Sequence, residues 1–356
     1  MRKPRVAVVN STSFGKYSNA IERLRRLCEV DVLTVPKDVG GRRLAEHLKE
    51  IDIVIAAPNP SYKSDFFENN LDIASIIRHG TGIDNIDVDS ATKFGVVVIR
   101  VPGAVEREAV AEHTIALILS AVRKIPQAHL KVKEGKWAKR AGLIGFEIKG
   151  KTIGIIGLGN IGGRVAEILI KGFNAKVLAY DPYLPEDRIR ELGAVPVDFD
   201  TLLRESDIVT LHCPLTKDTY HIIDEEAFEK MREGAVLINT GRGKLVDTNA
   251  LIKVLEQGKL SCVALDVMEN EPIDGNHPLL KFENVIITPH IAANTFESLM
   301  GMDEHVVKAI NSLLSGEVPE GVVNREVFGA ENLRLRRLIE QLSLNQSIYK
   351  RFWTDK

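Results

Sequence analysis

Three segments in the second half of the sequence each place a chemically able side chain just after a short apolar run. Arg242 follows the run that ends at Asn239, Glu269 and Glu271 follow the next run, and His290 follows the last. An Arg can hold a carboxylate with two N–H groups and polarise an adjoining carbonyl. A His can deliver a proton near neutral pH, and a carboxylate bonded to its other ring nitrogen fixes its tautomer. These residue types predict proton transfer on a small carboxylic acid, with either Glu as the partner of His290.

A glycine-rich turn precedes these segments. The run Ile153–Ile156 has the β-branched, apolar character of a parallel strand buried on both faces, and Gly157, Gly159 and Gly162 follow it as G-x-G-x-x-G. In such a turn the first glycine permits the tight bend and the second lets a pyrophosphate approach the backbone. The third lets the helix pack against the strand. The order strand, glycine turn, helix predicts a dinucleotide site.

The residues after the turn complete this unit. A helix expected over Ile161–Gly172 would direct its free N–H groups and the positive end of its dipole at the phosphates. A second strand, Lys176–Tyr180, ends in Asp181, nineteen residues after Gly162. An acidic side chain there can accept both ribose hydroxyls of NAD and would repel the additional phosphate of NADP. The unit predicts NAD as the cofactor, although such turns also occur in α/β proteins without a ligand.

The chemically able residues also have a plain structural interpretation. An isolated Arg at a strand end is commonly a surface ion pair, an isolated His after Pro is commonly a turn residue, and either Glu could be solvated. Their position after strands of the same predicted sheet as the glycine turn favours chemistry. In open α/β sheets, ligands bind outside the carboxyl ends of the strands.

The elements that must position these residues are short apolar strands alternating with helices. In the first hundred residues we expect five strands, at Arg5–Asn10, Val30–Val35, Ile51–Ala57, Ile73–Arg78 and Val96–Val101. After the glycine unit we expect four more, at Ile208–His212, Val236–Asn239, Cys262–Val267 and Val285–Thr288. This alternation is typical of parallel, doubly wound sheets.

Two long apolar-periodic helices indicate how the halves connect. One is expected over Glu106–Lys124 and leads into the second domain. The other is expected from Asn294 to about Leu314 and returns the chain to the first domain. We therefore predict an α/β protein in which a Rossmann NAD-binding domain is inserted in a flavodoxin-like substrate domain. The predicted substrate domain is 1–103 plus 291–330, the predicted NAD-binding domain is 104–290, and 331–356 is a helical tail.

Composition excludes several other classes. The 356 residues carry a net charge of −2 and therefore lack the basic field that nucleic-acid binding needs. No apolar run approaches the ~20 residues of a membrane span. The cysteines, Cys28, Cys213 and Cys262, are odd in number and far apart, so they predict neither a disulfide framework nor a metal site. We expect a cytoplasmic protein without a metal, a membrane or a nucleic-acid partner.

Motifs along most of the chain resemble a known family. They are GTGIDNID (80–87), VPG (101–103), AEHTIALIL (111–119), GLGNIGGRVA (157–166), HCPLT (212–216), NTGRGKLVD (239–247), ALDVMENEP (264–272) and TPHIAANT (288–295). In this order, over about residues 50–325, they resemble the D-isomer-specific 2-hydroxyacid dehydrogenases. That family includes phosphoglycerate dehydrogenase and glyoxylate or hydroxypyruvate reductases.

The resemblance implies roles for individual residues. It implies that Arg242 orients the substrate, that His290 is the acid/base, and that Glu271, directly before Pro272, is the partner of His290 rather than Glu269. The cofactor residues that it and the glycine turn imply are Gly157, Gly159, Asn160, Ile161, Gly162, Asp181, Cys213, Thr240, Asp266 and Thr81. It further implies that the backbone N–H groups of Gly80, Thr81 and Gly82 hold the substrate carboxylate, and that the protein is a homodimer through its cofactor domain.

The implied activity is hydride transfer between NAD(H) and C2 of a small D-2-hydroxy acid or 2-oxo acid. The sequence departs from the commoner family pattern at Arg100, where many members have Asn, and at His79, where many have Ala or Ser. Arg100 could bind an anionic far end of the substrate or form an ion pair outside the site. The alternatives are a non-catalytic NAD-sensing protein, like the corepressors that share this fold, and a dehydrogenase of formate or phosphite.

Overall fold

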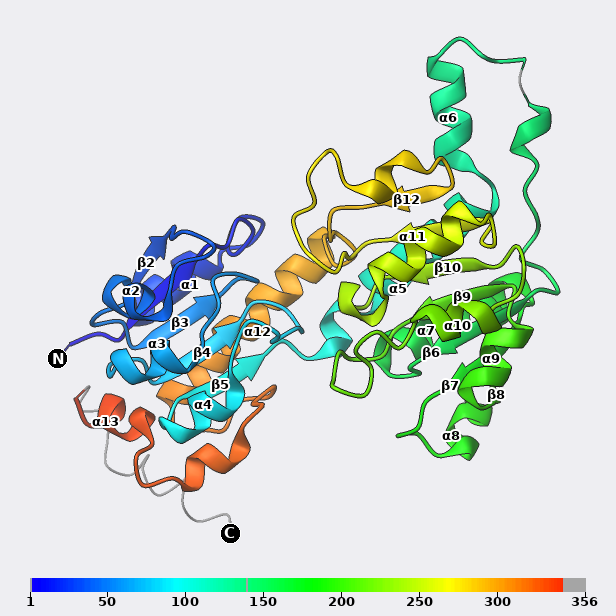
Figure 1. Ribbon diagram of the computed structural model, residues 1–356. Helices are drawn as coiled ribbons and strands as arrows, with labels where there is room; N and C mark the ends of the chain where they lie inside the picture. Colours follow the sequence, from blue (N-terminus) through cyan, green and yellow to red (C-terminus); the bar gives the residue numbers. More distant parts are fainter. Residues whose placement is uncertain (1, 139, 342–356) are drawn as a thin grey trace. The chain divides into compact units, whose positions relative to one another are not determined.

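Contacts divide the chain into two compact units (Figure 1). The structure is a computed structural model that describes residues 2–138 and 140–341. Unit 1 comprises the described residues up to Glu106 together with those from Thr295 onward, and unit 2 is Arg107–Asn294. Part of the predicted tail, residues 342–356, lies outside the described residues.

Unit 1 contains a parallel five-stranded sheet in the order β2-β1-β3-β4-β5, which is the flavodoxin-like order. Its strands are β1 (Arg5–Val9), β2 (Glu29–Leu33), β3 (Ile53–Ala56), β4 (Ser75–Arg78) and β5 (Val97–Arg100). Its helices are α1 (Ala20–Leu27), α2 (Gly41–His47), α3 (Ser64–Asn69), α4 (Val88–Lys93), α12 (Phe296–Leu314) and α13 (Arg334–Gln341), with the 3-10 turn η4 (Arg325–Gly329). The five strands that the apolar runs predicted in this part of the chain are all present.

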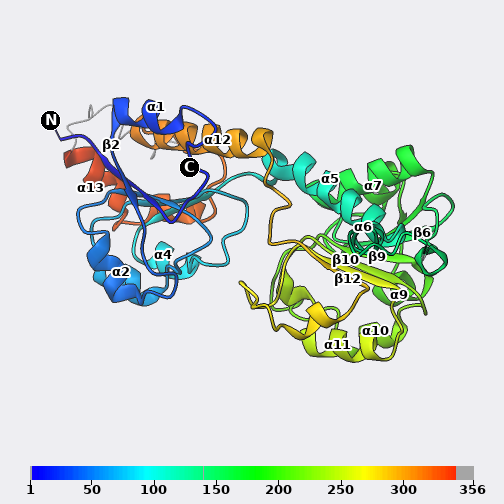
Figure 2. The same ribbon diagram turned by 90° about the horizontal axis from the view of Figure 1, so that it is seen from above.

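Both faces of this sheet are covered because successive residues of each strand point to opposite sides. Val6 and Val8 pack with α1, α12 and α13, whereas Ala7 and Val9 pack with α2 and α3. Figure 2 shows α1 and α12 on one side of the sheet and α2 and α4 on the other. The helical spacing predicted for the tail is present in α13, whose Leu335, Leu338 and Ile339 are buried in this core.

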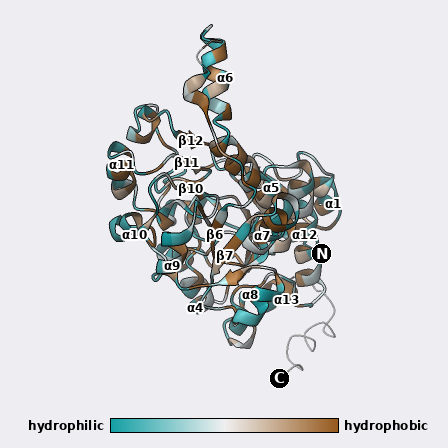
Figure 3. Cartoon of the chain, turned by 90° about the vertical axis from the view of Figure 1, so that its right-hand side faces the viewer, coloured by the Kyte–Doolittle hydropathy of each residue, from teal (hydrophilic) through white to brown (hydrophobic). Residues whose placement is uncertain are grey.

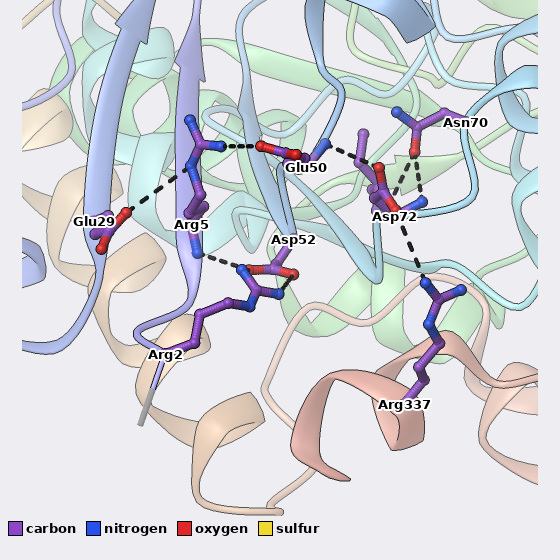
Figure 4. A network of polar contacts seen from close by, with 9 residues as sticks. Arg2, Arg5, Glu29, Glu50, Asp52, Asn70, Asp72 and Arg337 are labelled. Atoms are coloured by element: carbon purple, nitrogen blue, oxygen red, sulfur yellow. Dashed lines mark hydrogen bonds and ion pairs between the residues drawn. The ribbon is translucent and has the colours of Figure 1, made fainter. Parts of the chain in front are cut away.

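A network of ion pairs crosses the amino-terminal edge of the same sheet (Figure 4). The carboxylate of Asp52, just before β3, accepts both terminal nitrogens of Arg2, at 3.0 and 2.6 Å, and the backbone N–H of Arg5 at 2.7 Å. Arg5 in turn pairs with Glu50, and Asp72 with Arg337 of α13. These contacts tie the chain's first strand and its last described helix to the edge opposite the predicted substrate loops.

Unit 2 contains a parallel seven-stranded sheet in the order β12-β11-β10-β9-β6-β7-β8. Its strands are β6 (Thr152–Ile156), β7 (Lys176–Tyr180), β8 (Val195–Pro196), β9 (Ile208–Leu211), β10 (Val236–Asn239), β11 (Cys262–Leu265) and β12 (Val285–Ile287). Its helices are α6 (Ile125–Lys133), α7 (Asn160–Phe173), α8 (Glu186–Glu191), α9 (Phe199–Glu205), α10 (Glu225–Lys230) and α11 (Thr248–Glu256), with 3-10 turns η1 (Ala141–Leu143), η2 (Gly243–Leu245) and η3 (Pro278–Lys281). Helix α5 (Gly103–Val122) begins in unit 1 and continues into unit 2.

The strand order of unit 2 reverses direction between β6 and β9, as in a Rossmann fold. Two core clusters cover its faces, one with α5 and α7 and the other with α9, α10 and α11 (Figure 2). The predicted fold class, two doubly wound parallel sheets with a Rossmann domain, is confirmed. Strand β8 was not predicted, because two residues that include an edge-strand Pro carry no periodic signal.

Helix α6 and the residues after it form an arm that leaves the body of unit 2 (Figure 1). No residue of α6 is buried. Its Leu130 is 56% exposed, and on the loop that follows Trp137 is 70% and Ile144 76% exposed. In Figure 3, hydrophobic and hydrophilic segments both line this projecting helix. Large apolar side chains of this arm are thus exposed to solvent and lie outside the core of unit 2.

Candidate active site

The glycine turn between β6 and α7 has the shape that a bound pyrophosphate requires. Gly157 has φ +88°, and a Cβ there would lie 2.5 Å from the backbone nitrogen of Cys213. A Cβ at Gly162 would lie 2.0 Å from the carbonyl oxygen of Gly157, so helix and strand are in close contact there. A Cβ at Gly159 would meet nothing within 4 Å. Space over Gly159, together with the free N–H groups of the first turn of α7, fits a dinucleotide phosphate.

Asp181 and Cys213 border the same turn. One carboxylate oxygen of Asp181 accepts the backbone N–H of Leu158 at 2.8 Å, and the other accepts that of Tyr183 at 3.0 Å. The carboxylate is thereby fixed at the end of β7, with lone pairs left for ribose hydroxyls. Burial raises the pKa of the partly exposed Cys213 thiol to about 11. The thiol is therefore uncharged where it borders the glycine turn.

The turn that carries Arg242 is built by the side chain of Asn239, the last residue of β10. The Asn239 amide accepts the N–H of Gly241 at 3.0 Å and donates to the carbonyl of Arg242 at 2.8 Å. A Cβ at Gly243 would lie 2.0 Å from the carbonyl of Met268, so this turn packs directly on the segment after β11. Thr240 is buried, with its hydroxyl 2.9 Å from that of Thr114.

Asp266, after β11, organises the segment that carries His290. Its carboxylate accepts the Thr288 hydroxyl at 2.6 Å and the backbone N–H groups of Ile291 and Ala292, both at 2.9 Å. Burial acts to raise the pKa of Asp266, but these hydrogen bonds and one from His113 outweigh it, so the pKa lies below its ordinary value. The side chain is 1% exposed and is therefore an ionised anchor for residues 288–292.

His290 and Glu271 form a direct pair. The Nδ1 atom of His290 lies 2.8 Å from Oε2 of Glu271, whose Oε1 accepts the N–H of Met268 at 2.8 Å. Burial acts to raise the pKa of Glu271, and the hydrogen bonds from His290 and Met268 bring it below its ordinary value. His290 has φ +56°, in the left-handed region that non-glycine residues adopt infrequently. Its side chain is half-exposed, so the other ring nitrogen can meet a ligand.

Glu269 pairs with a different histidine. Its Oε1 lies 2.9 Å from Nε2 of His221, and its Oε2 accepts the N–H of Thr248 at 3.2 Å. The sequence left open which Glu meets His290, and only the resemblance favoured Glu271. The structure brings Glu271 to His290 and uses Glu269 to hold the segments around His221 and Thr248.

The loop of unit 1 that the resemblance assigns to the substrate carboxylate lies directly after β4. The Gly80 N–H donates to the carbonyl of Arg78 at 3.0 Å. The Thr81 N–H donates to Oε1 of Glu106 at 2.9 Å. Two of the three predicted N–H donors, those of Gly80 and Thr81, are therefore engaged within the unit, so a substrate carboxylate must displace Glu106 to reach Thr81. The carboxylate of Glu106 was not singled out in the sequence, where it is one of several Glu residues on an expected helix.

Arg100 ends β5, beside Arg78 at the end of β4. Its side chain is exposed, and in the described part of the chain no carboxylate lies within 4.0 Å of it. Within residues 2–138 and 140–341 no group of three or more His, Cys, Asp or Glu side chains could hold a metal ion. No helix among these residues is both long and apolar enough to cross a membrane.

Fold and site define a class of protein. A Rossmann sheet with a G-x-G-x-x-G turn, an acidic residue after its second strand and a hydrogen-bonded His–Glu pair after later strands is typical of a nicotinamide-dependent oxidoreductase. The comparisons give the particular family. The family model described as D-isomer specific 2-hydroxyacid dehydrogenase, NAD binding domain, matches residues 115–292.

Relatives cover nearly the whole chain. A glyoxylate reductase of Thermococcus litoralis is 38% identical over 332 residues, which are 92% of this chain and 98% of the relative. A D-3-phosphoglycerate dehydrogenase of Archaeoglobus fulgidus is 40% identical over 306 residues, 86% of this chain and 57% of the relative. A crystal structure of D-lactate dehydrogenase from Aquifex aeolicus, complexed with NAD and lactic acid, superimposes with a TM-score of 0.77 at 32% identity, covering 88% of this chain and 96% of that one.

The chain belongs to the D-isomer-specific 2-hydroxyacid dehydrogenase family. It is an NAD-dependent oxidoreductase, so the predicted family, enzyme class and cofactor are confirmed. The alternative of a non-catalytic NAD-sensing protein is not favoured by these relatives.

Proposed function

We propose that this enzyme reduces a small 2-oxo acid to the D-2-hydroxy acid, reversibly, with Arg242, Glu271 and His290 as its catalytic residues. The observation that carries the proposal is the His290–Glu271 pair, held at 2.8 Å beside the turn that presents Arg242. NADH, when bound over the glycine turn, supplies the hydride that C2 of the substrate receives.

Each side chain has a separate task in this scheme. Arg242 binds the substrate carboxylate and stabilises the negative charge that develops on the carbonyl oxygen in the transition state. His290 delivers a proton to that oxygen from the ring nitrogen that does not face Glu271. The ionised Glu271 carboxylate, 2.8 Å from Nδ1, fixes the orientation and the tautomer of the ring.

The two units divide the binding task. Unit 2 would bind NAD through Gly157, Gly159, Asn160, Ile161 and Gly162, with Asp181 on the adenosine ribose, and corresponds to the predicted domain 104–290. Unit 1 would bind the substrate through Gly80–Gly82, and Arg100 would favour a substrate whose far end is anionic. The exposed Arg100 side chain, without a carboxylate within reach in the described residues, supports that assignment. Thr240, on the turn that carries Arg242, and Asp266, which anchors residues 288–292, would support the nicotinamide end of the cofactor.

We also propose that two copies associate through unit 2. The support is the arm of α6 and the loop after it, where Leu130, Trp137 and Ile144 stay exposed. Large apolar side chains that stay exposed on one projecting segment are typical of a surface that another protein covers.

The test is NADH oxidation with glyoxylate, hydroxypyruvate, 3-phosphohydroxypyruvate, pyruvate and phenylpyruvate, each repeated with NADPH. Turnover of one or more acids with preference for NADH is expected. Arg242→Ala and His290→Ala should each lower turnover by at least about two orders of magnitude. Near-normal activity in either variant, or no turnover of any acid by an enzyme that binds NADH tightly, would overturn the proposal.

A further inference from the structure

A buried carboxylate of unit 1 joins three segments that are far apart in the sequence. Asp303 lies in α12, and its Oδ1 is 2.9 Å from Nε2 of His79, the residue between β4 and Gly80. Its Oδ2 accepts the Ser18 hydroxyl at 2.6 Å and the Gly15 N–H at 3.0 Å. Among the described residues neither Nε2 of His79 nor Oδ1 of Asp303 has an aligned hydrogen-bond partner, so the two atoms make a close polar contact, whereas the contacts of Ser18 and Gly15 are hydrogen bonds. One side chain thus brings the substrate turn and the loop 11–18 to the same helix.

The centre of this cluster is almost fully removed from water, whereas Gly15 and Ser18 are partly exposed. The side chains of His79 and Asp303 are 4% and 2% exposed. The ring of Phe14, also buried, meets the His79 ring edge-on with their centroids 5.3 Å apart. A buried carboxylate costs free energy unless its oxygens are bonded, and its removal from such a set leaves donors unsatisfied. The cluster therefore fixes the geometry of what it holds.

The cluster holds the Gly80–Gly82 turn, which is proposed to bind the substrate carboxylate. The backbone N–H of His79 donates to Ala56 at the end of β3, at 3.0 Å, and the side chain of Arg78 donates to the His79 carbonyl. Gly80 follows with φ +141°, a backbone conformation that residues with a Cβ rarely adopt. A rotation of the His79 peptide would therefore redirect the N–H groups of Thr81 and Gly82.

We propose that His79 and Asp303 are positioning residues, which fix the backbone of the Gly80–Gly82 turn and the loop 11–18 so that the turn can bind the 2-oxo acid once Glu106 releases Thr81. This inference rests on the proposed function for the substrate, and it adds two residues that do not touch the reacting atoms. It assigns them to substrate affinity, because the groups that transfer the hydride and the proton lie in unit 2.

The experiment compares His79→Ala, His79→Gln, Asp303→Asn and Ser18→Ala with the parent enzyme. The Gln side chain retains a polar N–H group that can reach Asp303, so it should restore most of what Ala loses. We expect KM for the 2-oxo acid to rise about tenfold in His79→Ala and Asp303→Asn and less in Ser18→Ala. The turnover number at saturation and the Kd of NADH should change less than about twofold.

The matched control is Glu304→Gln, one position along α12. Glu304 forms a half-exposed ion pair with Arg23 and does not contact the cluster, so its loss should leave KM unchanged. A rise in KM that equals that of Asp303→Asn would contradict a specific role for the cluster. So would a loss of turnover at saturation in His79→Ala with KM unchanged.

A second readout does not depend on activity. Hydrogen exchange of the backbone N–H groups in the loop 11–18 and in 79–82 should become faster in His79→Ala and Asp303→Asn and stay as in the parent in Glu304→Gln. If the parent reduced no 2-oxo acid, the proposed function would fail while this exchange still decided whether the cluster holds the turn. Unchanged exchange in both variants would overturn the inference.

Discussion

Oε2 of Glu271 lies 2.8 Å from Nδ1 of His290, whereas Glu269, two positions earlier, reaches His221 instead. The two carboxylates share one short segment after β11 and have histidine partners of the same type. Both histidines have their backbones in the left-handed region, at φ +56° for His290 and φ +51° for His221, but the side chain of His290 is half-exposed whereas that of His221 is 23% exposed. The pair with an accessible ring nitrogen can exchange a proton with a ligand, and the other pair holds the fold together.

Glu271→Gln should lower the rate of 2-oxo acid reduction by about ten- to a hundredfold. The amide keeps a hydrogen bond to Nδ1 but removes the negative charge beside the ring that transfers the proton. Steady-state kinetics at saturating 2-oxo acid would show the loss as a lower turnover number. Glu269→Gln is the matched control and should keep the turnover number of the parent; the same loss in both variants would rule out the assignment.

Substitutions of two glycines in the glycine turn should affect different properties, NADH affinity in one case and stability of the fold in the other. Gly159→Ala meets open space and should leave thermal stability nearly unchanged, while NADH binds at least about tenfold more weakly because the methyl group occupies the approach of the pyrophosphate. Gly162→Ala places its Cβ 2.0 Å from the carbonyl of Gly157 and should destabilise unit 2 by about 1–3 kcal/mol. Fluorescence titration and thermal unfolding measure the two effects. Unaltered NADH affinity in Gly159→Ala would count against the dinucleotide position.

Periodic apolar runs carried enough information to predict the two sheets, because strands buried on both faces leave uninterrupted β-branched segments. The glycine spacing and the motif order likewise predicted where the cofactor unit and the chemical residues lie. The sequence could not show which glutamate pairs with which histidine. Glu269 and Glu271 are chemically alike, and only the folded backbone directs one to His290 and the other to His221.

Polar contacts between residues far apart in the chain could not be predicted from the sequence either. Asp303 is one acidic residue on an amphipathic helix, and nothing in its spacing relates it to His79 or Ser18. Asp266 was assigned to the cofactor through the resemblance, and its hydrogen bonds to the segment 288–292 were not foreseen. Such contacts depend on which loops the strand order brings together.

Asp266→Asn should destabilise the protein by about 2–4 kcal/mol at neutral pH, because Asp266 is 1% exposed and its ionised form accepts the Thr288, Ile291 and Ala292 donors. The folded-state pKa is lowered from its ordinary 3.8, so the contribution is fully present above that value and is lost as the pH falls through the lowered pKa. Urea unfolding of parent and variant at pH 7, 5 and 3 should give a difference that is constant between the first two and smaller at the third. A difference that grew toward pH 3 would mean that Asp266 is not an ionised anchor.

The arm of α6 should carry the contact between two copies. Leu130→Lys combined with Ile144→Lys places two charges on side chains that are 56% and 76% exposed, so the isolated chain should fold as before while a buried dimer contact becomes costly. Sedimentation velocity should show a dimer for the parent and a monomer for the double variant, with similar circular dichroism. The control is Tyr183→Lys, an equally exposed apolar side chain at 77% on unit 2 outside the arm, which should remain dimeric. A double variant that stays dimeric would place the contact on another surface.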